Sequence, residues 1–533
     1  MRLFGVSQRS TAGLFAAVLW STFSARVAWA QTCESARPTD PGGGAGVNYG
    51  AADVTSFDSP GGAARIWYAL SGSHAPLSAD SAAPPAVVAA ARAADAALSK
   101  FQELGFAPPL SDADSPCATN GGDAKVDIYL ADFSAADGKA VSDHCLAGAV
   151  SRCSGFVIVE NDFARSGYTD LTEAMNTVVP HELFHLVQNA YDAELERWWA
   201  EGSAQWAAKQ LHPELRDLER FLPSFFSQPW RPLDVPASGV AADYLYATAI
   251  WPVFLSERHG VDFVRQVFDG LAAGATTTLS SVATLLEQKG TTLGEEFLWF
   301  AAYNAATGVR AQPGLGYQHA ADYPLVALTP LASEPGSSAD EVGSGLSAFY
   351  YSLETAEPRD LTLDTDPSRM AGLLVPLADG RAALDAALPL PAQAKTSALV
   401  VVAGQSVAKT DAPFHLGVAE AGSGTNPTGS EKLSSSCSLA HGAGLAASPG
   451  RAAFGALLGL VALVLLAVTR RSLAHRPSHE TIAGSSRVAR RHAMHAARFP
   501  ARAFVRARRV RLRGTRRRRR FRGCRRRSHR QGR

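Results

Sequence analysis

Between residues 84 and 310, hydrophobic residues recur mainly three or four positions apart, as on one face of a helix. The pattern is clearest over 84–106. Two apolar runs, at 127–132 and 155–160, predict strands instead, because they are too short for helices. Further helices are expected at 169–192, after a turn at 198–206, and at 244–255, 261–271 and 293–305.

After about residue 312 the pattern changes to short apolar stretches between turn residues, which is typical of strands. These stretches lie at 347–354, 361–363, 372–377, 398–402 and 414–418. The fold class is therefore expected to be α+β. A domain over 83–312, with a small sheet and then a mainly helical part, precedes a small β-sandwich-like domain over 335–420.

Residues 1–30 have the features of a secretory signal peptide: a basic start, an apolar run at 12–19, and a small-x-small site ending at Ala30. A short membrane anchor is the alternative, but this run is too short to span a bilayer comfortably. Residues 31–82 are rich in glycine, serine, proline and alanine. We expect them to be partly disordered or to act as a propeptide.

The C-terminal part contains a candidate membrane segment. A Gly/Ser/Thr-rich linker at 421–436 comes first. Residues 452–469 carry no charge, and as a helix they would extend about 27 Å, enough to cross a bilayer. A buried core helix is the alternative. The flanking arginines favour a membrane span, with Arg470 and Arg471 on the cytoplasmic side.

The charges along the chain are strongly segregated. The totals of 51 basic and 49 acidic residues nearly cancel, yet Glu480 is the only acid in the arginine-rich segment 470–533. The exported portion is therefore acidic, which argues against nucleic acid as its partner. The tail at 472–533 cannot form a core. It is either a basic segment for anionic lipid or nucleic acid, or translation beyond the natural gene end, which we favour.

Four cysteines lie in the predicted exported portion, where an oxidising compartment allows two disulfides. Cys145 and Cys153 are close in sequence and could join a loop, which would leave Cys33 with Cys117. Three pairings are possible. A cysteine-ligated zinc is disfavoured, because the chain has no CxxC spacing among these residues.

The residues from His181 to His185 read His-Glu-Leu-Phe-His, an HExxH motif within the predicted helix 169–192. Residues four apart lie one helical turn apart on the same face, so His181 and His185 can bind one ion while Glu182 holds a water. This is the residue set that a zinc hydrolase requires. Because of Pro180, either the helix begins near Val179 or a longer helix bends there.

A tetrahedral catalytic zinc also needs a third protein ligand. Glu201 follows His185 by sixteen residues, which allows a second helix to fold back and present its carboxylate. The neighbouring Trp198 and Trp199 would wall the site. The alternative for Glu201 is a carboxylate that only stabilises a helix N-terminus. Other candidate ligands are Asp192, Glu194 and Glu196.

The segments HELFHLVQ and WWAEGSAQW resemble the gluzincin type of zinc metallopeptidase, and more closely a myxobacterial family of exported HExxH metalloproteases, over about 85–310. The resemblance implies a zincin-like fold, with His181, His185 and Glu201 as Zn²⁺ ligands and Glu182 as general base. Gln205 departs from the family pattern, in which an aspartate at this position supports the first histidine. Gln188, Asn189 or another group would then take over that support.

A second resemblance concerns 437–471, where Cys437, the apolar segment and the arginine cluster are similar to the myxobacterial C-terminal sorting signal known as MYXO-CTERM. This signal implies processing near the cysteine and display at the cell surface. In an ordinary C-terminal anchor, Cys437 would be incidental.

These features together predict an exported zinc metallopeptidase that acts on proteins or peptides. Tyr244 or Tyr246 would stabilise the oxyanion, and the strand at 155–160 would be an edge strand that pairs with extended substrate. Two other functions are a cell-wall or aminopeptidase-like hydrolase and a catalytically silent surface adhesion protein. A catalytically silent protein is disfavoured, because the chain retains the complete set of His181, Glu182, His185 and Glu201. The sequence determines neither substrate preference nor oligomeric state.

Overall fold

The computed structural model describes residues 36–113, 123–132, 136–235 and 242–422. These residues form a mixed α+β structure with several sheets. Within these ranges, no helix combines the length and the apolar character that a membrane crossing needs. The predicted signal peptide, the span at 452–469 and the arginine-rich tail lie outside the described residues, as does the predicted linker from residue 423 onward.

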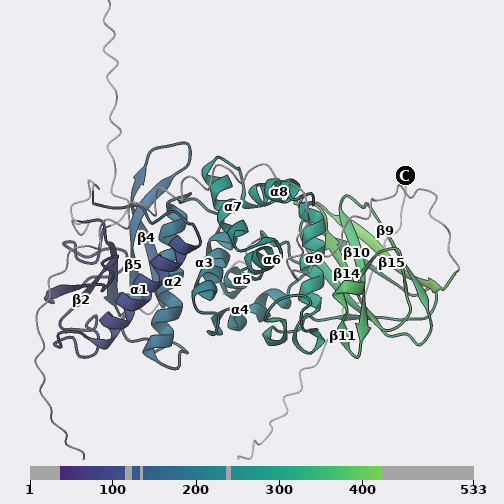
Figure 1. Cartoon of the computed structure of the whole chain (residues 1–533), viewed down its shortest axis with the longest axis horizontal. Helices are drawn as coiled ribbons and strands as arrows, with labels where there is room; N and C mark the ends of the chain where they lie inside the picture. Colours follow the sequence, from purple (N-terminus) through teal and green to yellow (C-terminus); the bar gives the residue numbers. More distant parts are fainter. Residues whose placement is uncertain (1–35, 114–122, 133–135, 236–241, 423–533) are drawn as a thin grey trace, which may run out of the picture. The chain divides into compact units, whose positions relative to one another are not determined.

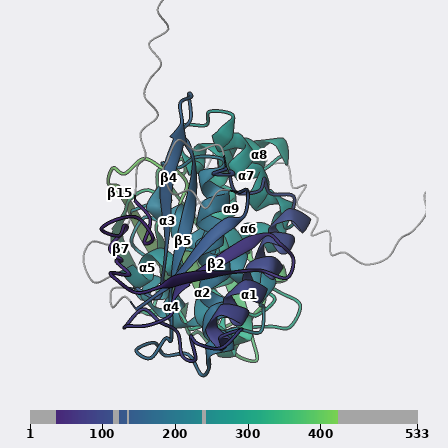
Figure 2. The same ribbon diagram turned by 90° about the vertical axis from the view of Figure 1, so that its left-hand side faces the viewer.

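A five-stranded sheet forms the N-terminal half of the molecule, with the strand order β1-β2-β3-β5-β4. Strands β2, β3 and β5 are parallel, and the edge strands β1 and β4 are antiparallel to their neighbours. Helices α1 (Pro85–Glu103) and α2 (Leu171–Asn189) cover one face of the sheet, as Figures 1 and 2 show. The strands are β1 (Val54–Asp58), β2 (Ala64–Ala69), β3 (Val126–Ala131), β4 (Gly138–Leu146) and β5 (Arg152–Glu160).

The other face of the sheet is covered by the segment that precedes β1. Val47 and Tyr49 are buried there against Tyr129 and Phe156. The interpretation of 31–82 as partly disordered is therefore wrong for the described residues from 36 onward. They contribute two strands and a buried cover, because their few apolar side chains pack against strands far away in sequence.

Arg37 anchors this covering segment and is 1 % exposed. Its guanidinium forms buried ion pairs with the carboxylates of Asp112, Asp127 and Asp143. It also lies 5.2 Å from the centre of the Phe156 ring. One arginine thus holds three buried carboxylates on the face of the sheet opposite α2.

The strand at 155–160 was expected to be an edge strand, and this expectation is wrong. The strand pairs with β3 on one side and with β4 on the other. The edge is β4, which the sequence pattern did not identify. A disulfide joins Cys145 of β4 to Cys153 of β5, as predicted. The pairing of Cys33 with Cys117 lies outside the described residues.

The middle of the chain is helical. The predicted helix at 244–255 is divided into α5 and α6, because Pro252 has no backbone N–H for the carbonyl of Thr248 and its ring would clash with that carbonyl in a continuous helix. The Thr248 hydroxyl lies 2.6 Å from the carbonyl oxygens of both Trp198 and Leu245. Helices α4 and α8 were not predicted. The bounds are α3 (Arg197–Leu211), α4 (Asp217–Phe226), α5 (Ala242–Ala247), α6 (Ile250–His259), α7 (Asp262–Ala272), α8 (Thr278–Gln288) and α9 (Leu293–Ala305).

The C-terminal described part consists of two sheets, with the strand orders β11-β10-β14-β8-β6 and β13-β9-β15-β7. Side chains from both sheets share one apolar core. The five predicted strands are present as β8 (Ala348–Leu353), β9 (Arg359–Thr365), β10 (Met370–Ala378), β14 (Ala398–Gly404) and β15 (Ala412–Glu420). The others are β6 (Thr329–Leu331), β7 (Ser338–Gly343), β11 (Arg381–Ala382), β12 (Leu388–Pro389) and β13 (Ala392–Ala394).

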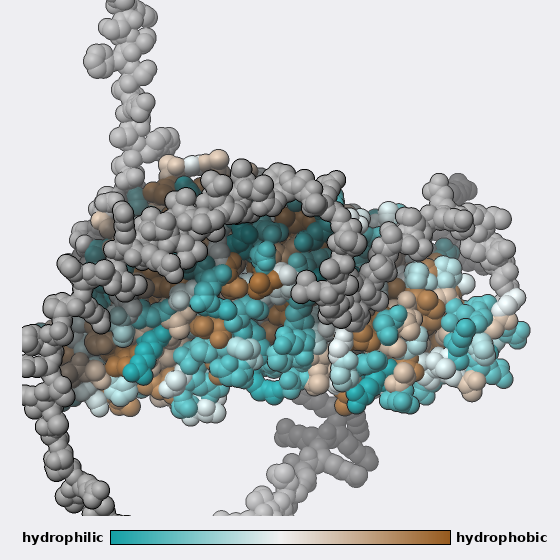
Figure 3. All heavy atoms as spheres, viewed as in Figure 1, coloured by the Kyte–Doolittle hydropathy of each residue, from teal (hydrophilic) through white to brown (hydrophobic). Residues whose placement is uncertain are grey.

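The β-rich part contacts the helical part through β14 and α9. Gln405, which directly follows β14, donates from Nε2 to the carbonyl oxygen of Gly294 at 3.1 Å. On the face drawn in Figure 3, the described surface is mainly hydrophilic, with hydrophobic residues scattered over it.

Candidate metal centre

Helix α2 carries the HExxH motif and begins well before it. The Asp170 carboxylate accepts the backbone N–H groups of Thr172 and Glu173 and so caps the helix. Pro180 lies inside the helix, so the shorter of the two predicted helices is excluded. Phe184 anchors α2 in a cluster of aromatic rings that includes Phe101 at 5.1 Å. This packing fixes the direction in which the motif's polar residues point.

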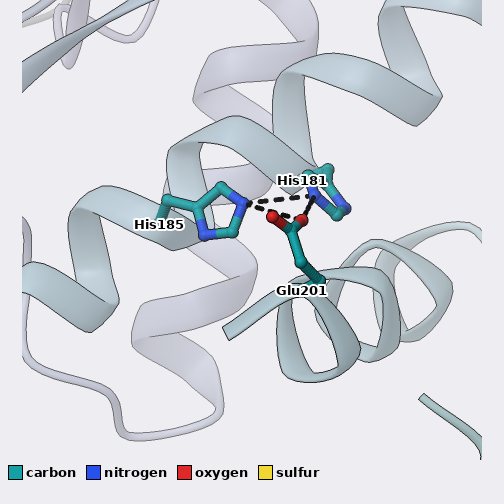
Figure 4. A group of neighbouring side chains, drawn as sticks. All are labelled: His181, His185 and Glu201. Carbon is teal, nitrogen blue, oxygen red and sulfur yellow. Dashed lines mark hydrogen bonds and ion pairs between the residues drawn. The ribbon is translucent and has the colours of Figure 1, made fainter. Parts of the chain in front are cut away.

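The structure brings His181, His185 and Glu201 together (Figure 4). His181 Nε2 lies 3.2 Å from His185 Nε2 and 3.3 Å from Glu201 Oε2, and His185 Nε2 lies 3.6 Å from the same oxygen. A zinc ion with bonds of about 2.0–2.1 Å separates its ligand atoms by about 3.3–3.4 Å in a regular tetrahedron. The three side chains therefore fit a tetrahedral ion with one position left open.

Glu201 reaches this position because α3 packs closely against the break between α5 and α6. A Cβ atom added to the adjacent Gly202 would lie 2.6 Å from Thr248 Oγ1. Trp198 and Trp199 are buried in the core, and Trp199 packs against Phe268 at 5.7 Å between ring centres. The tryptophans thus anchor α3 instead of walling the site, contrary to expectation.

The other candidate acids have different roles among the described residues. Glu196 accepts the backbone N–H of Thr278 at 2.8 Å, at the start of α8. Asp192 accepts the backbone N–H of Glu194 at 2.9 Å and stabilises a turn. Glu194 itself is exposed. Glu201 is the acid that joins the two histidines.

Gln188 supports His185 directly. Its Oε1 lies 2.8 Å from His185 Nδ1, where it can accept a hydrogen bond from the protonated ring nitrogen and leave the lone pair of Nε2 for a metal ion. The amide nitrogen of Gln188 donates to the Ala200 carbonyl (2.8 Å) and to Ser203 Oγ (3.0 Å). Gln188 therefore links the face of α2 that carries His181 and His185 to α3. Asn189 instead contacts Ser142 Oγ at 3.1 Å.

Gln205, at the position where gluzincins often have an aspartate, donates from Nε2 to Asp217 Oδ2 at 2.8 Å. Asp217 is the first residue of α4, so a carboxylate reaches this region from a different helix. Burial raises the pKa of Asp217, and nearby donors, including Gln205 and Arg220, partly offset this effect. The charge of Asp217 is also felt by His181.

The electrostatics of the cluster favour a bound cation. Burial raises the pKa of Glu201, but hydrogen bonds and charge from His181 and His185 outweigh burial and hold this pKa well below its usual range. For His185, burial lowers the pKa, but the hydrogen bonds to Glu201 and Gln188 and the charges of Glu201 and Glu182 together outweigh burial and raise it to about 9. Without a metal, a proton on the histidines partly neutralises Glu201.

Glu182 lies beside the cluster, against edge strand β4. Burial raises the pKa of its carboxyl group, which accepts a hydrogen bond from the backbone N–H of Ala140. A Cβ atom on Gly138 would lie 2.7 Å from Glu182 Oε1 and 2.5 Å from a methyl carbon of Val178. Only glycine at position 138 leaves room for the carboxylate.

Tyr246 is the tyrosine that faces the cluster. Its ring centre lies 5.5 Å from that of His181, and it stacks on Phe221 at 4.8 Å. Burial and the charges of Glu201 and Glu182 raise its pKa, so the hydroxyl keeps its proton and can donate. Tyr244, the alternative, is fully buried and stacks on Phe225, away from the site.

Two cavities meet at the site, and Gly138, Glu182 and Tyr246 line both. The first has a volume of about 300 Å³ and extends along the C-terminal half of α2 and along β4. The second, about 240 Å³, extends along the N-terminal half of α2 toward α4. The cluster therefore lies in a cleft with space on both sides of Glu182.

Sequence reasoning missed Gly138 and Asp217, because β4 and α4 were not recognised. Strand β4 alternates weakly, with Asp143 and His144 adjacent in its sequence. Helix α4 has a clear apolar face, which a search for helical periodicity could have found. A scan against protein-family models, a search of curated proteins and a search of solved structures found no match to the chain.

Proposed function

We propose that the protein is an exported zinc-dependent metallopeptidase. The spacing of the ligand atoms of His181, His185 and Glu201 supports this proposal most strongly, because it suits a tetrahedral ion with an open position. Two nitrogen ligands and one carboxylate, with Glu182 beside them, are the composition of a hydrolytic zinc site. The zincin-like fold and the relationship to gluzincins belong to the same proposal.

When bound, a zinc ion supplies a Lewis acid that polarises the peptide carbonyl and lowers the pKa of a water molecule toward about 7. Glu182 takes a proton from the attacking water as the new carbon–oxygen bond forms. It then delivers this proton to the leaving nitrogen as the carbon–nitrogen bond breaks. The Tyr246 hydroxyl donates a hydrogen bond to the oxygen on which negative charge develops.

Strand β4 supports an extended substrate. It is an edge strand whose residues Gly138, Lys139, Ala140 and Ser142 line the first cavity. Edge strands offer unpaired backbone groups to a peptide, which binds largely through its main chain. Because both cavities extend from Glu182, peptide can continue on either side of the cleaved bond, which favours an endopeptidase over an enzyme restricted to chain ends.

Zinc content and casein cleavage by the purified protein test the proposal. We expect one zinc per chain, and Glu182→Gln should keep the zinc while activity falls about 10²- to 10⁴-fold. Glu201→Ala should lose zinc. Glu194→Gln, an exposed glutamate nearby, is the matched control and should retain both. A protein without zinc, or equal cleavage by Glu182→Gln, would leave a surface-binding protein as the better description.

A further inference from the structure

The second cavity carries a distinctive set of charges. Three carboxyl side chains line it, from Asp137, Glu182 and Asp217. Among the described residues that line it there is no lysine or arginine. The first cavity also has three carboxyl side chains, from Glu182, Asp192 and Glu201, but it includes Lys139 as well. The cleft is therefore more acidic on the side of α4 than on the side of the β4 strand end.

Neighbouring donors hold the two aspartates in place. Asp137 accepts hydrogen bonds from Ser166 Oγ and from the Tyr168 hydroxyl. Asp217 accepts from Gln205 at 2.8 Å and from Arg220 Nη1 at 3.2 Å. An ionised carboxylate offers about four lone-pair positions, so each group retains capacity for a further donor. Tyr168 lies close enough to feel the charge of both.

The walls between these carboxylates are aromatic. Tyr168, Phe221 and Tyr246 line the cavity. Arg220 lies at its outer side, with its guanidinium 5.7 Å from the Tyr168 ring centre and 6.0 Å from that of Phe221. Its side chain is 55 % exposed, so solvent screens its charge. An apolar wall that leads to carboxylates suits a side chain with an aliphatic stem and a cationic end.

We propose that this cavity binds the side chain of a lysine or arginine of the substrate, next to the bond that is cleaved. The inference rests on the proposed peptidase function, because Glu182 and Tyr246 line both the cavity and the reaction site. Asp137 and Asp217 receive the ammonium or guanidinium group. The specificity of the enzyme is then for basic residues.

A pair of peptides that differ in one charge tests this directly. The probes are acetylated and amidated Ala-Ala-Lys-Ala-Ala and the same peptide with norleucine, which has a similar stem without the ammonium group. We expect cleavage at one fixed bond beside the lysine, with kcat/KM at least about tenfold above that for norleucine, as one charge-assisted hydrogen bond allows. Asp137→Asn and Asp217→Asn should reduce this ratio toward one.

Asp132→Asn is the matched control, because Asp132 pairs with Arg165 on the surface and does not line the cavity. It should keep the tenfold ratio. Zinc content must be equal in all variants, since Asp217 lies near His181. The free-amino form of each peptide distinguishes a bound side chain from a bound chain terminus. If the norleucine peptide with a free amino group is cleaved as well as the acetylated lysine peptide, the cavity binds a terminal amine and the inference is wrong.

Binding of the same peptides to zinc-loaded Glu182→Gln, measured by calorimetry, separates the two proposals. Tighter binding of the lysine peptide, lost in Asp137→Asn, supports the basic cavity even if no peptide is cleaved by the wild type. Cleavage without preference for lysine, or with a preference that both aspartate variants retain, overturns the cavity and leaves the peptidase. Equal binding of lysine and norleucine peptides also overturns it.

Discussion

Two buried clusters of charged side chains lie on opposite sides of the five-stranded sheet, and they differ in how their charge is balanced. In the cluster beneath the N-terminal segment, Arg37 supplies a permanent cation to three aspartates. In the cluster on α2, Glu201 meets two imidazoles that are neutral unless protonated. The first cluster contains its own cation, whereas in the proposed function the second exchanges a proton for a metal ion.

The difference in accessibility follows the same division. Arg37 and its partners are closed from solvent, with Asp143 completely buried. His185 and Glu201, by contrast, line a cavity of about 300 Å³. A closed ion cluster stabilises one conformation, whereas an open cluster can bind and release ligands. The closed Arg37 cluster on one side of the sheet thus suits a structural role, and the open cluster on the other side suits ligand binding.

Replacing the internal cation should give the largest effect. Arg37→Met leaves three buried carboxylates without their partner, and we expect the free energy of unfolding to fall by about 3–5 kcal/mol. Urea denaturation at pH 7 measures it. Arg65→Met is the control, because Arg65 pairs with the partly exposed Asp58 and should lose about 1 kcal/mol or less. Equal losses of unfolding free energy in the two variants would show that the ion pairs of Arg37 contribute no more than those of a partly exposed arginine.

Each cluster also has a tyrosine beside it, and only one should matter for catalysis. Tyr246→Phe keeps the stacking on Phe221 but removes the donor, so kcat should fall by about 10²- to 10³-fold, or about 2.7–4 kcal/mol. Tyr129 lies 3.5 Å from Arg37 in the closed cluster, and Tyr129→Phe should leave kcat unchanged. Steady-state kinetics with casein-derived peptides decides the matter. A full-rate Tyr246→Phe would remove this tyrosine from the mechanism.

The clusters should respond to pH in separate windows when zinc is absent. The His185 pKa is about 9, above its usual 6.5, so its stabilisation is complete below about pH 6.5 and is lost as pH rises toward 9. Burial raises the Asp112 pKa from 3.8 to about 6, so its destabilisation appears as pH rises from about 4 to 6. Each effect amounts to about 3 kcal/mol.

Denaturation of His185→Gln and Asp112→Asn across this pH range measures both windows. The difference in unfolding free energy between wild type and His185→Gln should change only between about pH 6.5 and 9. For Asp112→Asn the change should occur only between about pH 4 and 6. A shared window would mean that the two clusters are electrostatically coupled through the sheet.

The smallest effect should come from the group that orients His185. Gln188→Ala removes the hydrogen bond to Nδ1, and we expect zinc affinity to fall about 10- to 100-fold, or about 1.4–2.7 kcal/mol. Asn189→Ala is the matched control, because Asn189 contacts Ser142 and not a histidine. Competition with a zinc chelator measures both affinities. A larger loss of zinc affinity in Asn189→Ala than in Gln188→Ala would show that Asn189, and not Gln188, supports the site.

The α2 cluster was more predictable from sequence than the Arg37 cluster, for a physical reason. The helical repeat alone places His181 and His185 on one face, so two of the three candidate ligands follow from local spacing. Glu201 needed only a return of the chain sixteen residues later. Arg37, in contrast, meets partners that no local pattern connects to it, and its glycine-rich surroundings suggested disorder.

The fold shows the same limit. The long helices and most apolar strands were predicted because their hydrophobic residues repeat at a regular spacing. Strand β4 was missed because a free edge beside a cleft carries polar residues such as Lys139 and Ser142. The division between α5 and α6 could have been predicted locally, from Pro252 within the expected helix 244–255.

The Arg37 cluster also bears on the order in which the chain folds. Arg37 is separated by 75, 90 and 106 residues from Asp112, Asp127 and Asp143. Contacts over such loops form only after the loop entropy has been overcome, so the partners must first be assembled by β3, β4 and β5. We therefore expect the segment around Arg37 to be among the last to become protected from proteolysis during folding.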